Sequence, residues 1–225
     1  EITEYFKVLL RVMEQLYPDL RAKTTHLPHG IMKLTTGKMS SRTGKVVTGE
    51  GLLNELKEVV LTKMGSRAIE NKEQVADQVA GGALKNTVLK QAVGGDIVYD
   101  PAKMTNLEGD TGPYLQYTYA RARSVLAKAK TMKYDLGVKT YEWNKEEMAI
   151  LRWIYRYGEV VEEAGVKYAP HLVATYVYEL ATRFNSFYNA HKIGNDQGRL
   201  LLTMAVSQVL QSGLNLLGIQ APEEM

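Results

Sequence analysis

The sequence has 225 residues, of which 45% are hydrophobic and 24% charged, values typical of globular proteins. The net charge of +3 is compatible with a polyanionic partner but does not require one. The absence of cysteine excludes disulfides and thiolate metal sites and suits a reducing compartment, so we expect a cytoplasmic protein. No apolar run reaches the roughly 18–20 residues that span a membrane, and the acidic start does not match a signal peptide.

The first half of the chain alternates between helical and extended patterns. Apolar residues at helical spacing predict helices at about 4–17, 52–65 and 72–92. Pro18 is expected to end the first helix. Strand character is confined to the second half of 24–34 and to Ile97–Tyr99.

The stretch Lys38–Lys45, Lys-Met-Ser-Ser-Arg-Thr-Gly-Lys, concentrates cations and hydroxyl groups in a loop. Lysine supplies point charge, arginine a fork of donors, and hydroxyls and backbone amides neutral donors, so this loop can fold around polyphosphate. The alternative is a solvated basic turn, because most charge clusters are wet surface. It is not a Walker A loop, because Met39 stands where that pattern needs glycine and Val46 where it needs Ser or Thr.

A second informative stretch runs from residue 107 to residue 126. Thr111 and its neighbours offer capping groups, and Pro113 suits the first turn of a helix. Tyrosines and Arg121 then alternate around this helix. Because a buried tyrosine hydroxyl needs a polar partner, a pure core would be built more simply from Leu or Phe. The alternative is that these tyrosines are half-buried between helices.

From Trp143 onwards the sequence predicts only helices, at about 145–165, 171–190 and 197–217. The paired carboxylates at 146–147, 162–163 and 223–224 are expected to be solvated helix ends rather than an acid–base dyad. The four histidines lack metal-ligand spacing, so no metal site is expected.

Three segments carry a family resemblance. Lys38–Arg42, Lys-Met-Ser-Ser-Arg, resembles the KMSKS signature of class I aminoacyl-tRNA synthetases, in the form seen in arginyl-tRNA synthetases. Glu108–Tyr117, Glu-Gly-Asp-Thr-Gly-Pro-Tyr-Leu-Gln-Tyr, resembles the segment that links the catalytic and anticodon-binding domains of that family, and Leu217–Met225 resembles its C-terminus. Because the three matches occur in the right order, the chain is identified as the C-terminal part of an arginyl-tRNA synthetase. The absence of an initiator Met agrees with a fragment.

This resemblance implies a mainly α fold with two domains. Residues 1–107 would be the C-terminal remnant of a class I Rossmann-like catalytic domain with the KMSKS loop, and 108–225 an α-helical bundle that binds the anticodon. The full enzyme would activate L-arginine with ATP and transfer it to tRNA(Arg). Magnesium would accompany ATP as part of the substrate. No membrane partner is expected, and a monomer is favoured.

The resemblance also implies functional residues. The catalytic residues would be Lys38, Ser40, Ser41, Arg42 and Lys45. Lys38, with Arg42 or Lys45, would stabilise charge on the leaving pyrophosphate, while the serines would position the loop or donate to phosphate. ATP would contact Met32, Lys38, Met39 and Ser40. Arg42 departs from the second lysine of KMSKS, and a planar fork cannot replace a lysine identically.

The predicted tRNA contacts lie in the helical half. Anticodon bases are unstacked, and proteins read them by aromatic stacking and by hydrogen bonds to base edges. The candidates are Tyr114, Tyr117, Arg121, Tyr188 and Met225. For Tyr117 and Tyr188 the alternative role is packing between helices.

One departure from the family pattern concerns catalysis. The HIGH motif and the amino-acid pocket, which precede KMSKS in the family, are absent from these residues, so the chain alone is expected to be inactive. Two alternatives stay open. One is a non-catalytic tRNA-binding module, and the other is a different class I synthetase such as a cysteinyl enzyme. The lack of cysteine and the Gly-Pro-Tyr-Leu-Gln-Tyr segment argue against the latter.

Overall fold

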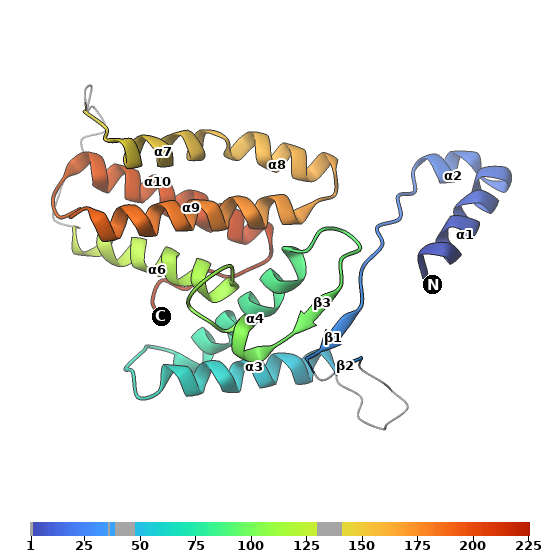
Figure 1. The fold of residues 1–225 in the computed structure, drawn as a ribbon, viewed down its shortest axis with the longest axis horizontal. Helices are drawn as coiled ribbons and strands as arrows, with labels where there is room; N and C mark the ends of the chain where they lie inside the picture. Colours follow the sequence, from blue (N-terminus) through green and yellow to red (C-terminus); the bar gives the residue numbers. More distant parts are fainter. Residues whose placement is uncertain (1, 36, 39–47, 130–140) are drawn as a thin grey trace.

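Helices dominate the part of the chain that the computed structural model describes, which is residues 2–35, 37–38 (backbone alone), 48–129 and 141–225 (Figure 1). The helices are α1 Ile2–Leu16, α2 Pro18–Ala22, α3 Gly49–Met64, α4 Lys72–Leu89, α5 Pro101–Met104, α6 Gly112–Lys128, α7 Lys145–Tyr155, α8 Tyr157–Val166, α9 Pro170–Ala190 and α10 Gln197–Leu216. The strands are β1 Met32–Leu34, β2 Gly37–Lys38 and β3 Ile97–Tyr99. The predicted mainly α fold is therefore confirmed. The assignment of residues 1–107 to a Rossmann remnant stays a prediction.

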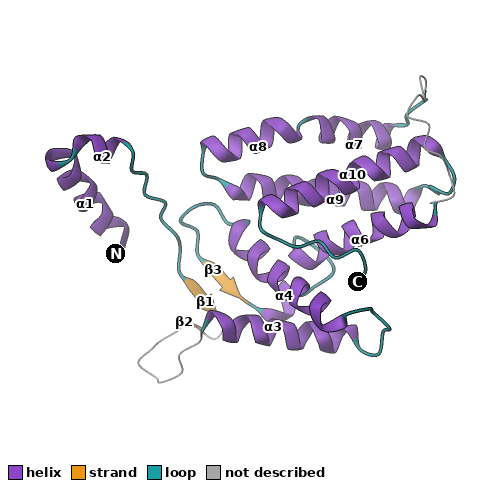
Figure 2. Ribbon diagram, turned by 180° about the vertical axis from the view of Figure 1, so that it is seen from behind, coloured by secondary structure: helices purple, strands orange, loops and turns teal. Residues whose placement is uncertain are grey.

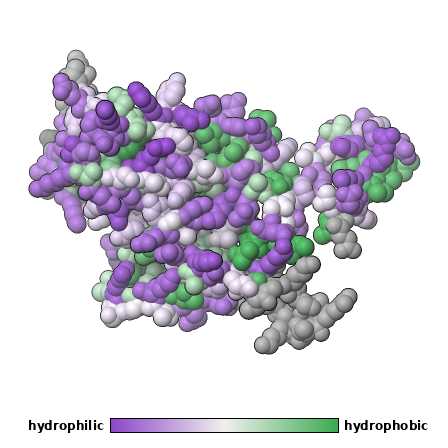
Figure 3. Space-filling view, viewed as in Figure 1, coloured by the Kyte–Doolittle hydropathy of each residue, from purple (hydrophilic) through white to green (hydrophobic). Residues whose placement is uncertain are grey.

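Helices α1 and α2 stand apart from the rest of the described chain (Figures 1 and 2). Neither helix buries a residue. The exposed face of α1 is an apolar stripe, made of Ile2, Tyr5, Val8, Val12 and Leu16. Apolar side chains are visible on this part of the surface in Figure 3. The predicted first helix is confirmed and ends at Leu16, just before Pro18. Pro18 also begins α2, since proline suits a first helical turn.

The small sheet packs against α3, α4 and α5. Strand β1 pairs in parallel with β3, so that Met32 lies opposite Ile97, and antiparallel with β2. Parallel strands need a long crossover, and α3 and α4 supply it. The apolar cluster beneath the sheet consists of Leu52, Leu56, Ala80, Ala83, Tyr99 and Met104. A separate cluster lies further along the two helices and consists of Val60, Met64, Val75, Ala76 and Val79.

Helices α6 to α10 share one apolar core. Its largest fully buried side chains include Leu115, Tyr119, Ile150, Leu180, Phe184, Phe187, Leu200, Leu202, Leu210, Leu214 and Ile219. The segment after α10 returns along α6, and the chain ends near α4 (Figure 1). No helix in the described residues combines the length and the apolar composition that a membrane crossing requires.

The predicted helix at 145–165 is wrong in one respect, because two helices meet at Arg156. The amide of Arg156 donates to the carbonyl oxygen of Trp153 at 3.1 Å, three residues back rather than four, which interrupts the α-helical pattern. Trp153 and Tyr157, on the two sides of this break, both lie against Tyr176 of α9, with ring centroids 5.5 Å apart in each pair. The break therefore falls where two rings share one partner.

The expectation that Glu147 is a solvated helix end is also wrong. Asn144 and Glu147 form a capping box, in which each side chain accepts a hydrogen bond from the other residue's amide, at 2.8 and 2.9 Å. The Glu147 side chain is only 1% exposed, and its carboxylate accepts from Nε of Arg199 at 2.8 Å. A buried carboxylate needs such partners, so Glu147 joins α7 to α10.

Helix α6 begins in close contact with α4 because glycine occupies both sides. A Cβ atom at Gly112 would lie 2.1 Å from the carbonyl oxygen of Gly82. One turn later Gln116 is fully buried, and its Nε2 donates to the carbonyl oxygen of Gln78 on α4 at 2.9 Å. Thr111 caps α6 as predicted, by accepting a hydrogen bond from the amide of Tyr114. These contacts fix the start of α6 against α4.

We predict that Gly112→Ala lowers the free energy of unfolding by about 1–3 kcal/mol, because the new methyl group meets backbone atoms that cannot turn away. The matched control is Gly158→Ala on α8, where a Cβ atom meets nothing within 4 Å. There, alanine should raise stability by up to about 1 kcal/mol. Denaturant unfolding followed by far-ultraviolet circular dichroism measures both. Equal stability of the two variants would contradict the close α4–α6 contact.

Candidate nucleic-acid interface

One face of α6 is polar. Tyr117, Arg121, Ser124 and Lys128 are spaced four, three and four residues apart, which places them on the same side of a helix. Tyr119 faces the opposite way into the core, is 1% exposed, and has its pKa raised by burial, so that its hydroxyl stays neutral. Tyr117 and Tyr119 of α6 therefore lie in two different environments, the polar face of the helix and the apolar core.

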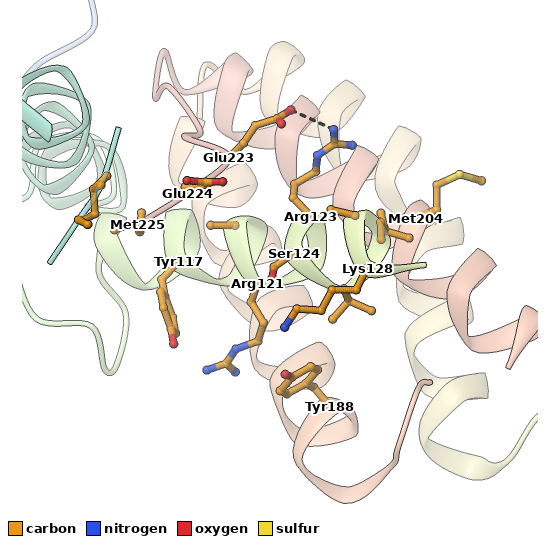
Figure 4. Close-up of a pocket in the computed structure, with 16 residues that line it drawn as sticks. Tyr117, Arg121, Arg123, Ser124, Lys128, Tyr188, Met204, Glu223, Glu224 and Met225 are labelled. Atoms are coloured by element: carbon orange, nitrogen blue, oxygen red, sulfur yellow. Dashed lines mark hydrogen bonds and ion pairs between the residues drawn. The ribbon is translucent and has the colours of Figure 1, made fainter. Parts of the chain in front are cut away.

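Arg121 lies between two aromatic rings, one from its own helix and one from α9 (Figure 4). Its guanidinium carbon is 4.8 Å from the ring centroid of Tyr117 and 4.9 Å from that of Tyr188. Its Nη1 donates to Oδ1 of Asn185 at 2.6 Å, and Nδ2 of Asn185 donates to the hydroxyl of Thr118 at 2.8 Å. Stacking and hydrogen bonding together hold the guanidinium in one orientation.

The polar face of α6 forms one wall of a pocket of about 930 Å³ (Figure 4). Tyr188 of α9 and Met204 of α10 also line it, and the end of the chain closes another side. The contributing residues from outside the bundle helices are Ala68, Ile69, Glu223, Glu224 and Met225. The volume is within the usual range for ligand sites.

The cations of this pocket are neutralised unequally. Arg123 donates to the carboxylate of Glu223 at 2.9 Å. Arg121 instead bonds the neutral amide of Asn185, and neither it nor Lys128 has an ion pair with another described residue. Glu224, which also lines the pocket, adds a negative charge. The pocket thus combines positive charge with ring faces, which suits an aromatic anion.

The predicted catalytic and ATP-binding site lies only partly within the residues that the structure describes. Met32 is half-buried in β1 and packs against the cluster that contains Leu52 and Leu56. The backbone of Lys38 pairs with Lys33 in the sheet. The other predicted catalytic and ATP-binding residues lie outside the described residues; they are Met39, Ser40, Ser41, Arg42 and Lys45.

Comparison with known proteins connects this geometry to a family. Residues 115–225 match the family described as DALR anticodon binding domain. The chain is 35% identical over 231 residues to the arginine–tRNA ligase of Clostridium kluyveri. This match covers 98% of the chain and 41% of that protein. It is 34% identical over 236 residues to the arginine–tRNA ligase of Parabacteroides distasonis, and this match covers 98% of the chain and 40% of that protein. The arginyl-tRNA synthetase of Thermus thermophilus matches the structure with a TM-score of 0.83 and 30% identity, over 93% of this chain and 37% of that one. The chain belongs to the arginyl-tRNA synthetase family.

The predicted identity as the C-terminal part of an arginyl-tRNA synthetase is confirmed. The chain spans about two fifths of the length of the two curated relatives, 41% and 40%. The DALR anticodon-binding domain covers residues 115–225 and so includes α7 to α10 and most of α6. The predicted boundary between residues 107 and 108 stays a prediction.

The structure brings together four of the five predicted tRNA-contacting residues of this synthetase chain. Tyr117, Arg121, Tyr188 and Met225 all line the pocket. Tyr114 does not; its ring lies 5.8 Å from that of Tyr178 on α9.

Sequence reasoning missed several contributors to this site, and two of them are instructive. Lys128 could have been found from its helical spacing with Arg121, but Asn185 could not, because its contact with Arg121 spans 64 residues of sequence.

We predict that Asn185→Ala lowers the free energy of unfolding by about 1–3 kcal/mol, since Arg121 loses the acceptor for its guanidinium and Thr118 loses a donor. The neighbouring Ser186 is exposed on the same helix, and Ser186→Ala should change stability by less than about 0.5 kcal/mol. Urea unfolding compares the two. A loss at Ser186 as large as that at Asn185 would argue against a specific network.

Proposed function

We propose that the pocket between α6, α9 and the end of the chain binds the anticodon of tRNA(Arg). The observation that carries the proposal is the placement of Arg121 between Tyr117 and Tyr188, on a domain of the anticodon-binding family. The names of the relatives support arginine over the cysteinyl alternative.

The chemistry of the pocket fits bases that are not stacked in a duplex. Every base has a π-face that can stack on an aromatic ring, and arginine can stack on a base or bind its phosphate. Tyr188 is 37% exposed and Tyr117 is half-buried, so part of each ring is accessible from solvent. Arg121 and Lys128 supply the charge that attracts the RNA backbone. Met225 supplies an apolar surface beside them.

Tyr114 has weaker support as an RNA contact. Its ring packs with Tyr178 and against the apolar core of the bundle, outside the pocket. We therefore assign the proposed RNA surface to Tyr117, Arg121, Tyr188 and Met225.

We predict that Tyr188→Ala weakens binding of a tRNA(Arg) transcript about 5–150-fold, because stacking contributes about 1–3 kcal/mol per base. The same loss is expected for Tyr117→Ala. Fluorescence anisotropy with labelled tRNA measures the affinity, and thermal unfolding shows whether each variant is folded.

The matched control is Tyr155→Ala, since Tyr155 is 90% exposed on α7 and does not line the pocket. Its loss should leave RNA affinity unchanged. If Tyr155→Ala weakens binding as much as Tyr188→Ala, the proposed RNA surface is in the wrong place.

We further propose that residues 1–107 complete a catalytic unit of a longer arginyl-tRNA synthetase, in which ATP, with magnesium, and L-arginine are substrates. Support comes from the Lys-Met-Ser-Ser-Arg segment at 38–42 and from relatives named arginine–tRNA ligase. In that enzyme Lys38, with Arg42 or Lys45, would stabilise the leaving pyrophosphate, and Ser40 and Ser41 would position the loop. Met32 and Met39 would contact ATP.

The chain on its own has a narrower proposed role. A HIGH motif does not occur in its 225 residues, so we expect RNA binding without adenylate formation. An arginine-dependent pyrophosphate-exchange assay on this chain separates a binding module from an enzyme, because turnover would contradict the former.

In the longer enzyme, Lys38→Ala should slow adenylate formation about 10²–10³-fold, since a preorganised charge at the transition state contributes about 3–4 kcal/mol. Affinity for tRNA should hardly change. Pyrophosphate exchange and a tRNA-binding assay measure the two effects separately. Equal losses in both would assign Lys38 to tRNA binding or to structure.

A further inference from the structure

The segment Leu217–Met225 runs from the helical bundle towards α3 and α4, and polar contacts hold it along its length. Its oxygen atoms accept hydrogen bonds from three side chains of α4 and α6: Lys85 to the carbonyl of Gly218, Gln116 to the carbonyl of Gln220 at 2.7 Å, and Arg123 to the carboxylate of Glu223 at 2.9 Å. Ile219 anchors it in the bundle core with 1% exposure. The segment is therefore clamped before it reaches its last residue.

The hydrogen bond to Gln220 comes from a side chain that is itself held in place by α4. Gln116 is fully buried, and its Nε2 also donates to the carbonyl oxygen of Gln78 on α4. The side chain that sets α6 against α4 thus also fixes the segment at Gln220. A displacement of the segment would leave the amide donor of Gln116 without one of its acceptors inside the protein, which is unfavourable.

Met225, at the far end of the segment, belongs to two surfaces. It lines the pocket together with Tyr117 and Arg121 (Figure 4). It also packs, half-buried, against the apolar cluster of α3 and α4 that contains Val60 and Val75. These two valines do not line the pocket. Met225 therefore bridges the pocket and the α3–α4 helix pair.

We propose that Leu217–Met225 is a strut that couples RNA binding in the pocket to the docking of the α3–α4 helix pair. The proposal rests on the proposed function of the pocket. RNA that contacts Met225 restricts it and so strengthens its packing on α3 and α4. Coupling between two sites is reciprocal, so docking of α3 and α4 must raise RNA affinity by the same factor by which bound RNA favours docking. A change that weakens the packing beneath Met225 is therefore expected to weaken RNA binding.

Hydrogen exchange tests the first half of this coupling. The last turn of α3, residues 60–64, carries Val60 and Met64 of the cluster beneath Met225 and does not line the pocket, so direct contact with RNA would not explain slower exchange there. The probe is a short RNA hairpin whose loop carries an arginine anticodon. Bound RNA should slow exchange at 60–64 about fivefold. In Met225→Gly the free protein should exchange faster at 60–64, and RNA should no longer slow it.

A double-mutant cycle tests the reciprocal half. Val60 does not line the pocket, so Val60→Ala loosens the cluster beneath Met225 without removing a pocket side chain, and it should weaken RNA binding about fivefold. In the Met225→Gly background the same change should have no effect. The control is Val59→Ala, the neighbouring half-buried valine outside that cluster, which should have no effect in either background. All measurements use a temperature at which circular dichroism shows every variant folded.

The outcomes separate this inference from the proposed function. RNA binding without slower exchange at 60–64 overturns the strut and leaves the proposed function intact. Equal effects of Val60→Ala in both backgrounds, or no effect in either, also overturn the strut. If the unaltered chain binds neither the hairpin nor a tRNA(Arg) transcript, the proposed function falls and the strut with it.

Discussion

The side-chain amide of Gln116 is a fully buried donor that needs acceptors, and it finds them on two segments that are far apart in the sequence. One is the carbonyl of Gln78 on α4, and the other is the carbonyl of Gln220 near the end of the chain. The amide fits against α4 because Gly82 has no side chain; a Cβ atom there would lie 2.4 Å from Oε1 of Gln116. Tyr117 is the next residue on α6 and Arg121 follows one turn later. The position of the proposed RNA pocket therefore depends on this packing.

Two polar networks in the bundle have different consequences. Glu147, Arg199, Asp196 and Tyr141 satisfy one another at the junction of α7 and α10, and burial together with the hydrogen bond to Asp196 raises the pKa of Tyr141 to about 12. Tyr141 thus remains a protonated donor, and this network is closed. The network around Arg121 is open, because its partner is a neutral amide and its charge is not cancelled by a described carboxylate. An open network of this kind can accept an anion.

Helix positions could be predicted from the sequence because apolar spacing records which face is buried. Thr111 and Pro113 likewise predicted the start of α6 from local chemistry. The sheet was harder to foresee, because strands of two and three residues carry too short a pattern to show their pairing. The burial of Glu147 depends on Arg199, 52 residues away, and no local pattern records that contact.

In the candidate site, too, some features follow from local sequence and others depend on contacts between distant residues. Tyr117 and Arg121 share a helix face, so their proximity follows from spacing alone. The separation of Tyr114 from them does not, because it depends on Tyr178 of α9. The contribution of Ala68 and Ile69 to the pocket is also tertiary, since it requires the α3–α4 connection to meet the end of the chain. Local sequence therefore predicts one wall of the pocket and leaves the others to the fold.

The sequence contains two tryptophans, and both lie in the second half of the chain. Trp153 stacks on Tyr176, is covered by the guanidinium of Arg183 at 4.5 Å, and donates through its indole nitrogen to a carbonyl of α9. Trp143 lies 4.4 Å from the ring of Tyr141. Intrinsic tryptophan emission therefore reports on the anticodon-binding bundle alone. Loss of structure in α3 and α4 would leave that signal almost unchanged, so fluorescence would record the melting of only half of the molecule.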